Sequence, residues 1–130
     1  MVTNKKSRGV KSRVNSFKYA FEGLSTLFKS EPNALIHLLA VLVVVFFGIF
    51  FEINKQEWII VLLLFALVFI SELFNSAIEY LSDIITTDHH PLIKKIKDMA
   101  AAAVLISALI SLAIGLIIFI PKIGTFLDSF

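Results

Sequence analysis

Residues Trp58–Asp83 read WIIVLLLFALVFISELFNSAIEYLSD, an apolar run that ends with two glutamates, an asparagine and an aspartate. On a helix that turns about 100° per residue, Glu72, Glu79 and Asp83 fall within about 40° of one another, and Asn75 flanks them at about 60°. These four side chains form an acidic stripe, and the apolar side chains around it face elsewhere. Charged side chains in a membrane segment are costly and point inward, so the stripe is a candidate functional site.

The composition of the chain predicts a membrane protein. Its 130 residues suffice for one domain, 58% of them are hydrophobic, and the mean hydropathy is +0.89. Soluble domains are roughly 45–50% apolar, and the core of a domain of this size cannot bury the additional hydrophobic residues. A soluble bundle of three buried helices is the alternative, but nothing in the chain would cover it. Without cysteine, the chain has neither a disulfide framework nor a cysteine-based metal site.

Three apolar runs predict three transmembrane helices in a single domain that covers residues 1–130. A hydrocarbon core about 30 Å thick needs roughly 20 helical residues, and each run reaches this length with its flanks. The predicted spans cover residues 34–51, 58–80 and 99–120. The expected fold class is therefore an all-α membrane protein.

The segment before the first span predicts an amphipathic surface helix at residues 13–29. Spacings of three and four place five apolar side chains on one face: Val14, Phe17, Phe21, Leu24 and Phe28. Such a helix can lie in the plane of the membrane surface, and the Lys- and Arg-rich segment before it would be attracted to anionic lipid. Pro32 then breaks the helix, which places Glu31 at the mouth of the first span.

The basic residues predict the orientation. Only Lys55, directly after the first span, and Lys122, directly after the third, lie on one side of the membrane. The other ten of the twelve lie before the first span or between the second and third: Lys5, Lys6, Arg8, Lys11, Arg13, Lys18, Lys29, Lys94, Lys95 and Lys97. By the positive-inside rule, the N-terminus is cytoplasmic and the C-terminus is outside. The acidic stripe then lies in the cytoplasmic half of the second span.

Acidic groups at this depth suit three kinds of arrangement. The first is a Mg²⁺ site that shares its cation with substrate phosphates, the second is an ion-coupled carrier site, and the third is a structural polar network. Too few basic groups lie within the spans to balance the acids, which argues against the third. Lys97, beside Asp98 at the start of the last span, suits a phosphate group. With five glycines and no GxxxxGK[ST] pattern, a kinase would need an unrelated arrangement.

The connector TTDHHP (residues 86–91) predicts a helix start. Thr87 or Asp88 is the expected N-cap, and Pro91 is expected in the first turn. His89 and His90 are candidates to ligate a metal or to donate to a nucleotide, although adjacent loop histidines are more often solvated.

Three segments together resemble the prokaryotic diacylglycerol kinase family, the small integral-membrane lipid kinases of bacteria, and most of all its Gram-positive undecaprenol kinase branch. They are ELFNSAIEYLSD (residues 72–83), DHHPLIKKIKDMAAAAVL (88–105) and GLIIFIPKI (115–123). The resemblance covers about residues 12 to 123, and its central motif is specific.

This resemblance implies a homotrimer in the bacterial inner membrane whose active sites are shared between subunits. It implies transfer of the ATP γ-phosphate to a membrane lipid alcohol with Mg²⁺ as cofactor, and no nucleic-acid partner. Glu72 would be the general base, Glu31 and Glu79 would hold Mg²⁺, and Asn75 and Ala101 would position the substrate. The residues expected to bind the nucleotide are Ser12, Tyr19, Glu31, Glu79, Asp88, His89, His90, Lys97 and Asp98.

Two positions depart from the family pattern. Ser12 falls where an arginine is frequent, with Arg13 beside it, and Pro32 stands where Gram-positive members often have arginine. The expected acceptor is undecaprenol, which would give undecaprenyl phosphate. Diacylglycerol, which would give phosphatidic acid, is the alternative. An ion-coupled carrier and a non-catalytic membrane scaffold are the alternatives from other functional classes.

Overall fold

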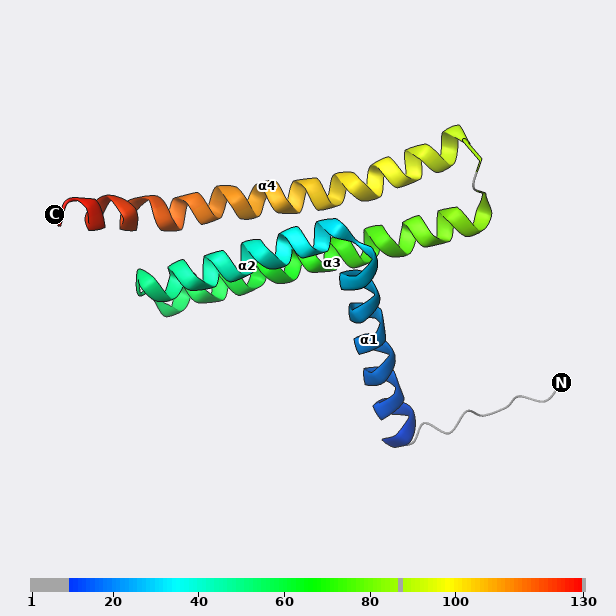
Figure 1. Cartoon of the computed structure of the whole chain (residues 1–130), viewed down its shortest axis with the longest axis horizontal. Helices are drawn as coiled ribbons and strands as arrows, with labels where there is room; N and C mark the ends of the chain where they lie inside the picture. The colour runs from blue at the N-terminus through cyan, green and yellow to red at the C-terminus, as the bar shows by residue number, and fades with distance from the viewer. Residues whose placement is uncertain (1–9, 87, 130) are drawn as a thin grey trace.

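Four helices make up the described part of the chain, which in this computed structural model comprises residues 10–86 and 88–129. They are α1 (Val10–Ser30), α2 (Pro32–Phe50), α3 (Lys55–Ile85) and α4 (Pro91–Leu127). Figure 1 shows α2, α3 and α4 running side by side, whereas α1 turns sharply away from the other three helices. The all-helical fold expected from the sequence is confirmed.

Three of these helices, α2, α3 and α4, are long and apolar enough to cross a membrane. At 1.5 Å per residue, the 31 residues of α3 and the 37 residues of α4 give lengths of about 46 and 55 Å. Both lengths exceed a hydrocarbon core of about 30 Å. The two long helices can therefore cross the core and still carry polar residues beyond it.

The starts of the spanning helices follow local sequence signals. Asn54 and Glu57 form a capping box at the start of α3: Oδ1 of Asn54 accepts from the N–H of Glu57, and Oε2 of Glu57 accepts from the N–H of Asn54. Pro32 and Pro91 occupy the first turns of α2 and α4. Proline suits this position because its fixed φ is helical and it has no N–H to leave unpaired.

The N-cap of α4 corrects one expectation. It is His90, whose Nδ1 accepts from the N–H of Leu92 at 3.2 Å, and not Asp88. Asp88 belongs to the preceding turn, where its N–H donates to Oγ1 of Thr86. Pro91 explains the difference, because a proline in the first helical turn leaves the residue before it as the cap. Thr87, the other predicted cap, lies outside the described residues.

Helices α3 and α4 pack antiparallel and are joined by an ion pair at each end. Near the connecting turn, Nζ of Lys97 lies 3.0 Å from Oδ1 of Asp83. At the far end, Nζ of Lys122 lies 3.1 Å from Oε2 of Glu57. The two pairs match the ends of α4 with the ends of α3, and Glu72 and Glu79 lie between them along α3.

Helix α1 is attached to the others through its C-terminal turn. Leu27 is 2% exposed, and the ring of Phe28 packs edge to face on the ring of Phe69, with centroids 5.7 Å apart. Farther along α1, Phe17 and Phe21 remain exposed. The junction of α1 and α2 is thereby held against α3 at a level close to the acidic stripe.

Substituting Gly48 by alanine is expected to destabilise the α2–α3 hairpin. A Cβ at Gly48 would lie 2.8 Å from Cη2 of Trp58 and 3.1 Å from Cδ1 of Ile53, and both side chains would have to shift. Overpacking of this kind costs about 1–3 kcal/mol. Thermal unfolding in detergent micelles measures the effect, with Gly23→Ala as the control because nothing lies within 4 Å of its Cβ position. Equal midpoints for the two variants would contradict the prediction.

Candidate active site

The acidic stripe is buried toward the middle of α3 and exposed near the C-terminus of the helix. Glu72 is 2% exposed and Asn75 is 8% exposed, whereas Asp83 is exposed. Three buried oxygens in this stretch make no hydrogen bond: Oε1 of Glu72, Oδ1 of Asn75 and Oγ of Ser76. Because buried polar groups are normally hydrogen-bonded, three such atoms on neighbouring turns make this stretch a candidate binding site for a polar ligand.

Glu72 has as a close neighbour a histidine that the sequence analysis did not single out. Nε2 of His37, on α2, lies 3.1 Å from Oε1 of Glu72, an ion-pair distance without the geometry of a hydrogen bond. The signal for it was present in the sequence, since His37 is the one ionisable side chain in the run ALIHLLAVLVVVFFGIFF (residues 34–51). A polar residue inside a span is by default a functional candidate.

Glu31 and Glu79 both lie close enough to Glu72 for their charges to act on it. Glu31 is the N-cap of α2, and its side chain makes no capping hydrogen bond. Glu79 lies two helical turns beyond Glu72, and its Oε1 accepts from Nδ2 of Asn75 at 2.9 Å. The fold therefore brings together one carboxylate from the α1–α2 junction and two from α3.

A polar pocket of about 290 Å³ lies at the turn between α3 and α4. It contains five of the residues expected to bind a nucleotide, together with four further residues of the same turn. Its lining consists of Asp83, Thr86, Asp88, His89, His90, Ile93, Lys94, Lys97 and Asp98. Lys97 donates to Asp83, and Lys94 donates to Asp98. Glu79 also acts electrostatically on Lys97, so this residue connects the pocket with the carboxylate group around Glu72.

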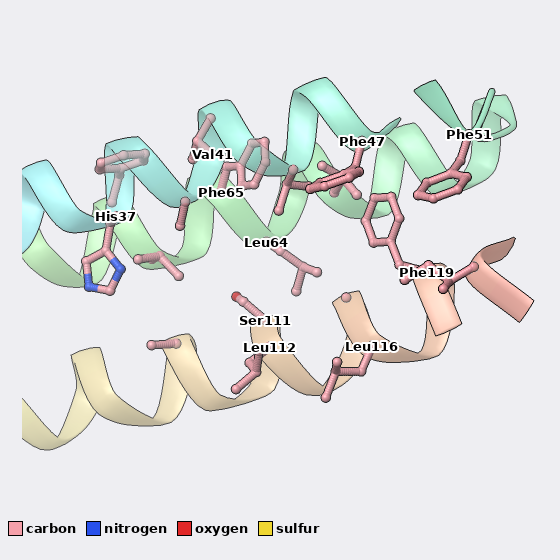
Figure 2. A pocket seen from close by; sticks show the side chains of 18 residues that line it. His37, Val41, Phe47, Phe51, Leu64, Phe65, Ser111, Leu112, Leu116 and Phe119 are labelled. Carbon is pink, nitrogen blue, oxygen red and sulfur yellow. The ribbon is translucent and has the colours of Figure 1, made fainter. Parts of the chain in front are cut away.

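An apolar groove of about 370 Å³ is lined by residues of α2, α3 and α4, among them His37, the neighbour of Glu72. Figure 2 shows His37 at one end of the groove and Phe51 and Phe119 toward the other, with Ser111 and Leu112 of α4 along its floor. Its lining is almost wholly apolar, so a phosphate group would be poorly solvated there. The charged part of a ligand belongs in the polar pocket instead.

Seven residues of the expected site line neither of these two pockets: Glu31, Glu72, Asn75 and Glu79, described above, and also Ser12, Tyr19 and Ala101. Ser12 is exposed on α1, Tyr19 is 64% exposed on the same helix, and Ala101 is exposed on α4. Among the described residues, no group of three or more His, Asp or Glu side chains could hold a metal ion. Within one copy of the chain, the structure thus brings together the buried carboxylate of Glu72 and the nearby carboxylates of Glu31 and Glu79, with the polar pocket at the turn after α3.

Comparison with known proteins gives the family. The model of the prokaryotic diacylglycerol kinase family matches residues 18–119. An undecaprenol kinase of Bacillus subtilis is 44% identical over 108 residues, which cover 83% of this chain and 88% of that protein. A diacylglycerol kinase of Haemophilus influenzae is 32% identical over 102 residues, covering 78% of this chain and 86% of that protein.

A diacylglycerol kinase of Synechocystis is 31% identical over 109 residues, which cover 83% of this chain and 62% of that protein. The matched stretches contain the acidic stripe and the turn between α3 and α4. The resemblance inferred from the sequence motifs is confirmed, and so is the expected enzyme class, a lipid kinase. The chain belongs to the prokaryotic diacylglycerol kinase family.

Proposed function

We propose that this protein transfers the γ-phosphate of ATP to the hydroxyl group of a membrane lipid, with undecaprenol as the acceptor and undecaprenyl phosphate as the product. The observation that carries the proposal is the buried carboxylate of Glu72, which contacts His37 of the apolar groove and lies on the same helix as Asp83 of the polar pocket. The 44% identity with an undecaprenol kinase favours a polyprenol. Diacylglycerol is the second candidate, because other relatives are diacylglycerol kinases at 31–32% identity.

In the proposed reaction Glu72 takes the proton of the lipid hydroxyl. The hydroxyl oxygen then bonds to the γ-phosphorus, the bond from that phosphorus to the β–γ bridging oxygen breaks, and ADP leaves with the electron pair. Asn75 orients the acceptor beside Glu72, and its partnerless Oδ1 is available for that contact. Phosphoryl transfer depends mainly on positioning and on neutralising charge, so few chemically active groups are needed.

Glu31 and Glu79 fit the role of Mg²⁺ ligands in this reaction. Mg²⁺ is usually held by one or two protein carboxylates, with substrate phosphates and water completing its shell. These two carboxylates act on the same buried group, and neither belongs to a larger cluster of metal-binding side chains among the described residues. The cation would neutralise the phosphate charge that develops during transfer.

The nucleotide would bind in the polar pocket, with Lys97 toward its phosphates. His90 has a structural task there as the N-cap of α4, and His89 is exposed beside it. The basic residues on this side of the chain support a position of the pocket at the cytoplasmic face, where ATP is found.

A homotrimer with shared sites would explain the residues that remain apart. Ser12 and Tyr19 would approach the nucleotide of a neighbouring subunit through α1, lying as an amphipathic helix in the membrane surface, and Ala101 would approach the acceptor. Large apolar side chains exposed on α2 and α4, such as Leu39 and Leu109, leave ample surface for such contacts.

The deciding experiment is phosphate transfer from γ-labelled ATP by the purified protein in detergent–lipid micelles. Undecaprenol and diacylglycerol are offered separately, each with Mg²⁺ and with EDTA. Label on either lipid that is lost with EDTA supports the proposal, and the two rates rank the acceptors. A folded preparation that labels neither lipid overturns it, and ion flux in reconstituted vesicles would then test the carrier alternative.

Replacing Lys97 by methionine is expected to raise the KM for ATP about 10- to 100-fold. Charge-assisted hydrogen bonds contribute about 1.5–3 kcal/mol, and the methionine side chain removes the charge while keeping most of the bulk. Initial rates measured against ATP concentration test this. Lys95→Met is the matched control, because Lys95 is exposed nearby and does not line the pocket. If Lys97→Met and Lys95→Met have the same KM for ATP, Lys97 does not contact the nucleotide.

A further inference from the structure

Of the described residues that line the apolar groove, His37 is the one that is ionisable, and it contacts the buried carboxylate of Glu72. It is on α2, its side chain is 23% exposed, and its Nε2 lies 3.1 Å from Oε1 of Glu72, whose own side chain is 3% exposed. Figure 2 shows the imidazole at the end of the groove, pointing into the space between α2 and α4. The ring therefore lies between the carboxylate and the region that an apolar ligand can reach.

A carboxylate as buried as Glu72 needs a partner, because an isolated buried charge is strongly disfavoured. The ionisable groups that act on it are His37 on α2, Glu31 at the start of α2 and Glu79 on the next turns of α3. Two of these three are acidic and repel it. Within residues 10–86 and 88–129, His37 is thus the one group that both contacts Glu72 and can carry a compensating charge.

We propose that His37 is a positioning residue, which holds Oε1 of Glu72 so that the second carboxylate oxygen faces the lipid hydroxyl. This inference rests on the proposed lipid kinase activity. His37 does not itself take the proton of the lipid hydroxyl. Its imidazole fixes the carboxylate rotamer from across the α2–α3 interface, where neither helix alone could supply the contact.

Such a role makes a separable kinetic prediction. His37→Leu keeps the bulk of the side chain but leaves Glu72 free to rotate, so kcat is expected to fall about 10- to 100-fold, as for other small misplacements of a reacting group. The KM for ATP stays within about twofold, because the polar pocket does not include His37. His37→Gln places an N–H donor at similar reach, which can hold the carboxylate in place of the imidazole, and is expected to recover most of the lost rate.

The experiment compares wild type, His37→Leu, His37→Gln and His37→Asn in the labelled-ATP assay, with the faster of undecaprenol and diacylglycerol as acceptor. His37→Asn is polar but too short to reach Glu72, so it decides the question if the leucine variant does not fold. Lys95→Met is the control, since that side chain on α4 is exposed and lines neither pocket. Thermal unfolding verifies that every variant is folded.

A double-mutant cycle separates positioning from general support of the fold. In the Glu72→Gln background, His37→Leu and His37→Asn are expected to cause no further loss, because the carboxylate they act through is gone. Equal losses in both backgrounds, or an unchanged kcat in the wild-type background, overturn the role of His37. The proposed lipid kinase activity would be unaffected by either result. A wild type that transfers no phosphate overturns the proposed function, and with it this inference.

Discussion

Replacing Glu72 by glutamine is expected to lower the rate of phosphate transfer roughly 10²- to 10⁴-fold, which is the usual contribution of a general base. Glutamine has nearly the same shape as glutamate and can remain beside Nε2 of His37, but it cannot take a proton from the lipid hydroxyl. The loss is therefore expected in kcat, with little change in the KM for ATP. Single-turnover transfer from γ-labelled ATP measures it most directly.

Glu57→Gln is the matched control for this variant, because it removes a carboxylate from the same helix at the opposite end. Glutamine can also serve in a capping box, so α3 should still begin normally, although the pairing with Lys122 weakens. We expect nearly wild-type transfer from this control. Retention of more than a tenth of the wild-type rate by a folded Glu72→Gln protein would show that Glu72 is not the base.

Replacing Glu79 by glutamine is expected to shift the Mg²⁺ dependence of the reaction. The amide oxygen can still accept from Nδ2 of Asn75, which Oε1 of Glu79 does at 2.9 Å, so the local geometry should survive. The negative charge that would bind the cation is removed, however. Since a catalytic metal ion contributes several kcal/mol to charge stabilisation, we expect the rate at fixed Mg²⁺ to fall about 100-fold or more.

A titration with Mg²⁺ tests this prediction, because a lost ligand raises the Mg²⁺ concentration needed for half of the maximal rate. Glu22→Gln is the control for net charge: Glu22 is exposed on α1, where it pairs only loosely with Lys18 at 3.8 Å. Identical Mg²⁺ titration curves for wild type and Glu79→Gln would show that Glu79 does not bind the metal ion. Loss of all activity in EDTA would still be required of a Mg²⁺-dependent kinase.

Much of the fold follows from local sequence signals. Runs of apolar residues long enough for a bilayer give α2, α3 and α4, and Pro32 and Pro91 mark where two of these helices begin. The N-cap of α4 was less predictable. Asp88 and His90 lie two residues apart and both can cap a helix, so the choice depends on how the turn after α3 is closed.

In the candidate site, too, some contacts follow from the sequence and others depend on tertiary packing. Residues of one helix or one turn, such as Glu72 with Asn75, or Asp88 with Lys97, are brought together by helical periodicity and a short connector, and the sequence predicts their grouping. The contact of His37 with Glu72 was missed. It depends on the register between α2 and α3, which is decided by packing such as that of Gly48 against Trp58.

The sequence by itself determined that this chain forms apolar helices with an acidic stripe near one end of the second span, since hydropathy and the 3.6-residue period need no tertiary information. Only the tertiary structure decided which side chain meets the buried carboxylate and that α1 carries Ser12 and Tyr19 away from the polar pocket of their own chain. These are long-range contacts. Their geometry depends on how the helices cross and slide against one another, and small changes in packing set it.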